Sequence, residues 1–169
     1  MMLLHRTVPF RTAIAALTFG LGGACSSDRV YAPTVVTPYA ELRNAPEVAL
    51  LDGAAVRLET YAWRDFMPIS PPDGKPLLVL IRIRRVDGPV VPSALKADSV
   101  WVVKGDLAWA AGVQEEQPRG PDWSFFEAMA RNGPKWGPGD TVDVVVRLRG
   151  AGGQRALVQV RDQVIRRTD

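Results

Sequence analysis

The sequence predicts an all-β domain built as an antiparallel sandwich of about seven strands. Apolar and polar residues alternate with a period of two in several segments, and turn-forming residues separate these segments at intervals of roughly 10 to 20 residues. The chain also contains 14 prolines and 15 glycines. Frequent turns between short alternating segments are typical of sandwiches rather than of parallel sheets covered by helices. The domain is expected to span residues 40–169, a length that suits one hydrophobic core.

The first half of this region contains four expected strands. In residues 56–63 the even-numbered side chains are small or apolar, while the odd-numbered ones are charged or aromatic. In residues 77–84 every odd position is apolar and the even side includes two arginines, which indicates one buried face and one half-covered face. Residues 100–103 and 107–113 are expected to form shorter strands, the second with weaker alternation.

The second half contains the strongest hairpin signal. Residues 141–148 and 155–161 both alternate, and the glycine-rich segment 150–153 supplies the turn between them. Residues 122–132 fit two structures. Asp122 could cap a helix that ends before Gly133, or the segment could be a strand with alternate residues facing the core. The sandwich context favours the strand.

The segment Trp136-Gly137-Pro138-Gly139-Asp140 leads directly into the valine-rich strand. It resembles an interstrand corner of bacterial immunoglobulin-like modules. The resemblance implies an immunoglobulin-like topology for the sandwich, and it carries no information about a ligand.

The N-terminal residues have the organisation of a secretory signal. Arg6 and Arg11 precede the apolar run 12–22, and small residues follow it up to Cys25. The run is too short to span a bilayer, because a membrane helix needs about 20 apolar residues. Residues Leu21–Cys25 are similar to the lipobox of bacterial lipoproteins, with a glycine at the position three before the cysteine where the family has leucine.

The lipobox resemblance implies that residues 1–24 are removed and that Cys25 is acylated. Residues 25–39 would then be a tether, and a flexible chain of about 13 residues spans on the order of 20 Å. By analogy with Gram-negative lipoproteins, Ser26 implies sorting to the outer membrane. The expected location is therefore the outer membrane, with the domain exported and facing the periplasm or the cell surface.

Processing changes the chemistry of the chain. Two of the 21 basic residues leave with the signal. The processed chain then has 19 basic and 18 acidic residues, and its net charge is +1. His5, the only histidine, also leaves, and acylation occupies Cys25, the only cysteine. Catalysis that depends on histidine or cysteine, and zinc, haem or copper sites built from these residues, are excluded. We expect no cofactor, no metal and no nucleic-acid partner.

Five tryptophans lie in the predicted domain. Trp63 and Trp101 fall inside strand patterns and are expected to fill the core of the sandwich or to plug its ends. Trp109, Trp123 and Trp136 fall in looser segments and are the candidate binding surface, because an exposed indole offers a large rigid face to a glycan or to another envelope protein.

The main functional hypothesis is a non-enzymatic binding or structural domain held at a membrane by lipid. One alternative is an inhibitor-like domain that acts through the proline-containing loops 66–76 or 114–121. Another is a small hydrolase that uses two carboxylates about 5 to 9.5 Å apart. The candidate acids for that hydrolase are Glu115, Glu116, Asp140 and Asp143. Asp140 is more simply explained as the cap of a turn, and Asp143 as a solvent-facing strand residue.

Overall fold

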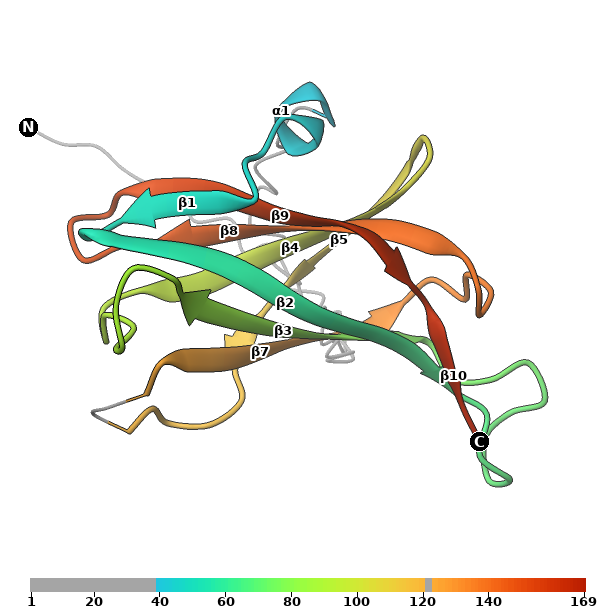
Figure 1. Ribbon diagram of the computed structural model, residues 1–169. Coiled ribbons are helices and arrows are strands. Elements are labelled where there is room, and N and C mark those ends of the chain that lie inside the picture. The colour runs from blue at the N-terminus through green and yellow to red at the C-terminus, as the bar shows by residue number, and fades with distance from the viewer. Residues whose placement is uncertain (1–38, 121–122) are drawn as a thin grey trace, which may run out of the picture. The chain divides into compact units, whose positions relative to one another are not determined.

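The computed structural model describes residues 39–120 and 123–169, which form two β-sheets packed face to face (Figure 1). This confirms the all-β sandwich. All seven expected strands form, and three short strands accompany them. The predicted signal, Cys25 and the tether up to Pro38 lie outside the described residues. Within the described ranges, no helix is long and apolar enough to cross a membrane.

The described residues form one short helix followed by ten strands. In order, these are α1 (Tyr39–Arg43), β1 (Val48–Leu51), β2 (Ala54–Asp65), β3 (Leu77–Arg85), β4 (Lys96–Lys104), β5 (Leu107–Gly112), β6 (Gln114–Glu115), β7 (Phe125–Gly133), β8 (Thr141–Arg149), β9 (Arg155–Val164) and β10 (Arg166–Thr168).

The strand order is that of an immunoglobulin-like sandwich. One sheet has the order β1-β2-β3-β7-β6, with β10 added in parallel to β2, and the other has the order β5-β4-β8-β9. Strands β2-β3-β7-β6 therefore take the positions A-B-E-D of immunoglobulin domains, and β5-β4-β8-β9 take the positions C′-C-F-G. All the other strand pairs are antiparallel.

The core lies between the two sheets and follows the predicted alternation. Alternate residues of β3, from Leu77 to Ile83, are fully buried. In β7 the fully buried residues are Phe126, Ala128 and Ala130. Asp122 lies outside the described residues, but from Phe125 onward the predicted strand is confirmed and no helix is formed. The period of two places these three side chains on one face against β3.

The placement of two tryptophans differs from expectation. Trp101 is 7% exposed, but it lies outside the sandwich, in a separate cluster with Leu42 and Val145. Trp63 is half-buried on the outer face of the six-stranded sheet, beside Tyr61. Trp101 is thus buried as predicted, although in a second cluster outside the main core, whereas Trp63 is not part of either core cluster. The strand period explains both, since Val100 and Val102 take the inward positions next to Trp101, and Ala62 and Arg64 take those next to Trp63.

Residues 39–43 form a helix, whereas the sequence predicts an all-β domain from residue 40 onward. Leu42 of the helix covers Trp101. The segment after the helix runs beside β9, where the backbone N–H of Gln159 donates to the carbonyl of Pro46 at 2.8 Å. The four-stranded sheet is thus covered by the main core on one face and partly by α1 on the other. The N-terminal residues of the described chain are part of the folded domain.

The two ends of the sandwich carry different loops. The end that we call the C-terminal end holds loop 66–76, loop 134–140, the turn at Gly105-Asp106 and the C-terminus, on the right of Figure 1. The opposite end holds the β3–β4 and β8–β9 connections and the chain between β6 and β7. Tyr39, at the start of α1, donates from its hydroxyl to the carbonyl of Gly105, so the described chain begins next to the C-terminal end.

Candidate functional site

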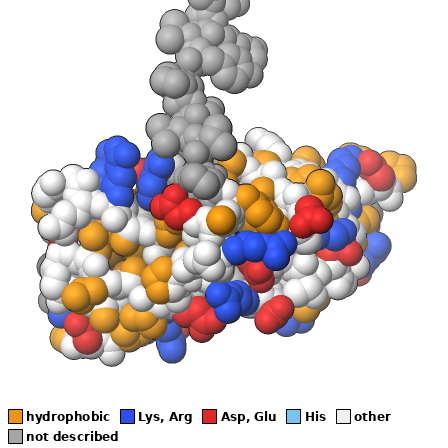
Figure 2. Space-filling view, turned by 90° about the horizontal axis from the view of Figure 1, so that it is seen from above, with side chains coloured by type: hydrophobic (Ala, Val, Ile, Leu, Met, Phe, Trp, Pro, Cys, Tyr) orange, Lys and Arg blue, Asp and Glu red, His pale blue; other side chains and the backbone are white. Residues whose placement is uncertain are grey.

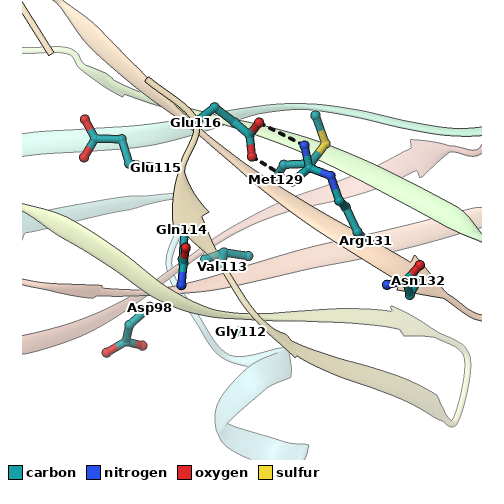
Figure 3. Close-up of a pocket in the computed structure, with 9 residues that line it drawn as sticks. All are labelled: Asp98, Gly112, Val113, Gln114, Glu115, Glu116, Met129, Arg131 and Asn132. Atoms are coloured by element: carbon teal, nitrogen blue, oxygen red, sulfur yellow. Dashed lines mark hydrogen bonds and ion pairs between the residues drawn. The ribbon is translucent and has the colours of Figure 1, made fainter. Parts of the chain in front are cut away.

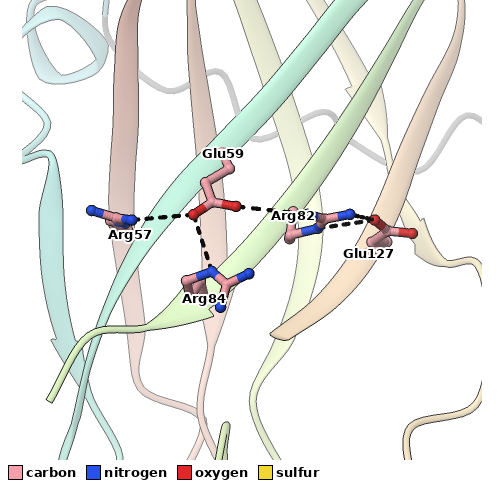
Figure 4. Close-up of polar contacts among 5 residues, drawn as sticks. All are labelled: Arg57, Glu59, Arg82, Arg84 and Glu127. Carbon is pink, nitrogen blue, oxygen red and sulfur yellow. Dashed lines mark hydrogen bonds and ion pairs between the residues drawn. The ribbon is translucent and has the colours of Figure 1, made fainter. Parts of the chain in front are cut away.

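A charged network occupies part of the outer face of the six-stranded sheet (Figure 4). Glu59 accepts hydrogen bonds from Arg57 at 3.2 Å and from Arg84 at 3.0 Å. Arg82 donates to Glu127 at 2.7 Å and lies 3.8 Å from Glu59. The five side chains link β2, β3 and β7 into one row of alternating charge.

Strand register produces this network. Glu59 lies opposite Arg82, and Arg82 lies opposite Glu127, so that each carboxylate faces a guanidinium on the neighbouring strand. The sequence predicts one buried and one half-covered face for residues 77–84, and Arg82 and Arg84 do point outward while Ile83 is buried. Each pair is partly exposed, so it contributes less than about 1 kcal/mol to stability. The network therefore matters chiefly for what it presents to a ligand.

An aromatic cleft lies next to the network. Trp123 and Phe125 have ring centroids 6.1 Å apart and planes inclined at 34°, and Trp123 is 38% exposed. Arg82 extends over the Phe125 ring at 4.4 Å from its centroid. The cleft has a volume of about 210 Å³, and we call it the Trp123 cleft. Its lining residues are Arg82, Glu116, Gln117, Trp123, Phe125 and Glu127.

A wider polar groove of about 580 Å³ lies on the other side of Glu116 (Figure 3). Glu116 accepts two hydrogen bonds from Arg131, at 2.8 and 2.9 Å, and this pair forms the boundary with the Trp123 cleft. A third hollow, of about 440 Å³, contains Glu115 and Arg119. Each of the three hollows is lined by two residues of the short segment 115–117, so β6 and the residues directly after it lie between them.

The four candidate acids are not gathered in one cleft. Glu115 is bound by Arg119 at 2.6 Å, and Glu116 is bound by Arg131. Asp140 is next to the C-terminal end, where it contacts Lys104 and accepts from the amide of Gly137 at 2.8 Å. This confirms Asp140 as the cap of its turn. Asp143 accepts from the amide of Asp162 at 3.0 Å.

These contacts keep the carboxyl groups ionised. Hydrogen bonds from Arg131 and Lys104 are the largest causes that lower the pKa of Glu116 and of Asp140. Burial acts to raise the pKa of Glu115, but hydrogen bonds and charge from Arg119 and Lys96 outweigh it, and the pKa is lowered. A catalytic general acid at neutral pH needs a raised pKa. At Glu115, Glu116 and Asp140 the pKa is instead lowered, so none of these three carboxyl groups is tuned as a general acid.

The structure does not bring the three candidate tryptophans together. Trp123 precedes β7 and Trp136 follows it, so they lie at opposite ends of a nine-residue strand, about 30 Å apart. Trp109 and Trp136 are partly buried and pack against the main core. A Cβ atom at Gly133 would lie 2.8 Å from the ring of Trp109. Of the three, only Trp123 is available as an exposed aromatic face within a cleft.

Loop 66–76, an element of the inhibitor hypothesis, is firmly held at its base. The guanidinium of Arg64 donates to the carbonyls of Lys75, at 2.9 Å, and of Asp73. Within the loop, the amide of Ser70 donates to Met67 at 2.7 Å, and that of Gly74 donates to Pro71 at 2.8 Å. The tip thus consists of two tight turns and not of an extended segment.

Sequence reasoning missed most residues of the Trp123 cleft. Arg82 and Glu127 are 45 residues apart and meet only through the β3–β7 register. Gln117 carries no local signal at all. Trp123 was found because a tryptophan in a turn-rich segment is unusual, and the following alternation predicts that Phe125 points to the outer face.

No protein-family model matches the chain, and no match was found among curated proteins or among solved structures. Within the described ranges, no group of three or more His, Cys, Asp or Glu side chains is placed to hold a metal ion.

On the face that carries α1, basic and acidic side chains lie interspersed, with apolar side chains between them (Figure 2).

Proposed function

We propose that the protein is an exported, lipid-anchored envelope protein whose sandwich domain has a non-enzymatic binding role. We further propose that the domain binds a neutral glycan in the Trp123 cleft. The observation that supports this is a half-exposed indole placed at an angle to a second ring, with paired charged groups around both. An aromatic face packs on the C–H face of a sugar ring, and the polar groups around it hydrogen-bond to hydroxyls.

The charges of the cleft favour a neutral ligand. Arg82 is paired with Glu127, and Glu116 is paired with Arg131, so that each charged group is already compensated. A charged ligand would have to displace one of these partners. A hydroxyl would not, because a carboxylate has about four lone-pair positions and a guanidinium has five N–H donors, which exceed those used by the pairs.

The anchor is supported by the sequence alone. Residues Leu21–Cys25 resemble a lipobox, and Cys25 is the only cysteine. Several acyl chains, each contributing about 0.8 kcal/mol per buried methylene, hold a protein firmly at a membrane. Mass spectrometry of the N-terminal peptide from wild type and from Cys25→Ala tests this part. A wild-type peptide that begins before Cys25, or that carries no acyl mass, contradicts the anchor.

Calorimetric titration with soluble fragments of cellulose, amylose and chitin tests the cleft. We expect at least one of these neutral oligosaccharides to bind, and we expect Trp123→Ala to weaken its binding about tenfold, because an aromatic contact contributes about 1.5 kcal/mol. Trp63→Ala is the matched control, since Trp63 is a half-buried tryptophan on the same sheet face outside the cleft. The proposal fails if none of the three binds, or if both variants weaken binding equally.

The inhibitor alternative has less support. An inhibitor needs a rigid protruding loop, and the firmly held loop 66–76 meets that requirement. A loop that enters a binding groove as an added strand must also be extended. The tip of loop 66–76 is folded into two turns, and the segment 114–120 is tied down by Glu115 and Arg119, whose guanidinium also donates to the carbonyl of Pro92 at 2.8 Å.

A further inference from the structure

The tip of loop 66–76 is an exposed apolar surface. Ile69 is 87% exposed, the highest value among the large hydrophobic residues of the described chain, and Met67 is 47% exposed. The segment from Met67 to Pro72 contains no charged residue and includes three prolines. A single exposed apolar residue needs no explanation, but a continuous uncharged tip indicates a contact with an apolar partner.

The loop is held so that this tip stays presented. Gly74 has φ +74°, and a Cβ atom there would lie 2.6 Å from the ring of Phe66, so the loop closes tightly over that ring. Lys75 donates to Asp65 at 2.8 Å across the base. The guanidinium of Arg64 also donates to the carbonyls of Asp73 and Lys75 in the loop. Little conformational entropy is therefore lost when the tip meets a partner.

The charged groups beside the tip are already paired. Lys75 is bound to Asp65, and Lys135 is bound to Asp73. The tip would therefore meet its partner through apolar contact and not through a net charge of one sign.

The position of the tether selects the partner. Tyr39 contacts Gly105 at the C-terminal end, and 13 residues separate it from Cys25. A flexible chain of that length spans on the order of 20 Å. The opposite end of the sandwich lies farther away by the length of a strand, about 30 Å for nine residues. A short tether thus favours the orientation in which the C-terminal end is the one nearest to the lipid.

A second exposed apolar residue lies at this end. Leu107, 58% exposed, follows the Gly105-Asp106 turn and starts β5. Loop 66–76 and this turn are on the same side of the molecule in Figure 1. Two separate elements thus present apolar side chains at the end of the sandwich where Tyr39, the first described residue, makes its contact with Gly105.

We propose that the C-terminal end of the domain rests on the membrane to which the protein is anchored, with Ile69 and Met67 inserted among the lipids. This inference rests on the proposed lipid anchor at Cys25. Apolar side chains of surface-bound segments reach about 5 to 10 Å into the boundary between headgroups and acyl chains. The rigid tip acts as a second, weak contact that orients the domain and leaves the Trp123 cleft, at the far end of β7, facing away from the bilayer.

Thiol labelling of the lipidated full-length protein on phosphatidylcholine vesicles tests the contact. Acylation occupies Cys25, so Ile69→Cys supplies one free thiol at the tip, and Val86→Cys supplies one at the opposite end, where Val86 is 45% exposed. We expect a bulky, water-soluble maleimide to react with the Ile69→Cys protein at least tenfold more slowly on vesicles than with the unacylated Cys25→Ala/Ile69→Cys protein in solution. The two Val86→Cys proteins should react at equal rates.

Each other outcome has a distinct meaning. Equal rates for Ile69→Cys on vesicles and in solution overturn the membrane contact. Slow labelling of the unacylated protein in solution also overturns it, since the tip would then be covered by a second copy of the chain. Vesicle flotation and the mass of the N-terminal peptide separate these results from failure of the anchor. A protein without the acyl mass contradicts the anchor, whereas an acylated protein with an unprotected tip contradicts only this inference.

Discussion

The buried guanidinium of Arg64 provides the most demanding test of how the domain is stabilised. Arg64 is 4% exposed and has no carboxylate partner among the described ion pairs. It donates instead to backbone carbonyls of Asp73, Lys75, Lys135 and Trp136. One side chain thus ties loop 66–76 to loop 134–140 and closes the C-terminal end of the sandwich.

Arg64→Met keeps much of the side-chain length and removes every donor. Four carbonyls then lose a charged hydrogen-bond partner, and each group left unsatisfied in a buried site costs about 1–3 kcal/mol. Part of this cost is offset, because the guanidinium no longer has to be desolvated. We therefore expect a loss of about 3–5 kcal/mol in the free energy of unfolding. For a domain of this size, each kcal/mol lowers Tm by about 4 °C, so Tm should fall by about 12–20 °C.

Thermal and urea unfolding followed by tryptophan fluorescence give these quantities. Arg57→Met is the matched control, because Arg57 is exposed and makes one ion pair, with Glu59, that contributes less than about 1 kcal/mol. Arg64→Lys restores the charge but not the fork of donors, and it should recover only part of the loss. If Arg64→Met unfolds within about 1 kcal/mol of the control, the carbonyl contacts do not carry the stability that we assign to them.

Two further predictions concern α1 and acid. Leu42→Ala should lower the free energy of unfolding by about 2–3 kcal/mol, because it leaves a cavity over Trp101. The control Leu50→Ala, at a site 72% exposed, should change this free energy by less than about 0.5 kcal/mol. Equal losses for the two variants in urea titrations would show that α1 is not part of the folded unit. Hydrogen bonds from Lys75 and Lys135 are the largest causes that lower the pKa of Asp65 and Asp73 below 3.8. Their stabilisation is therefore complete above that pH and is lost as the pH falls below it towards the lowered values. Tm measured across this range should fall less steeply for Lys135→Met than for wild type, and identical slopes would contradict the coupling.

The alternation of side chains was sufficient to predict the fold class and the seven main strands. A strand with one buried face has a strict period of two, and β2, β3 and β7 follow it. In β8 the period is broken at Val145, which is buried on the other face in the cluster with Leu42. The short strands β1, β6 and β10 escaped prediction because two to four residues are too few to establish a period. For β1 a local signal was available, since Asp52-Gly53, both with positive φ, form the two-residue hairpin turn to β2.

The functional surface was harder to predict than the fold, for a physical reason. Alternation reports that a side chain leaves the core, but it does not report what lies outside. Trp101, Trp63 and Trp123 all point away from the main core, yet the first is covered by α1, the second is half-buried against Tyr61, and the third lies in a cleft. What separates them is a short helix, a neighbouring aromatic residue and the course of the chain after β6, and none of these follows from the strand period.

The two proposed contact surfaces, which lie at opposite ends of the sandwich, differ in how far they could be predicted from the sequence. Loop 66–76 is fixed by contacts that mostly come from its own sequence neighbourhood, since Arg64, Asp65, Phe66 and Lys75 flank or belong to it. Its uncharged, proline-containing tip was therefore visible in the sequence. The Trp123 cleft needs residues from β3, β7 and the segment after β6, which only the completed sheet brings together. A perturbation that opens the end closed by Arg64 should therefore loosen the tip that we propose to contact the membrane, while leaving the proposed glycan binding in the distant cleft unchanged at temperatures where the domain stays folded.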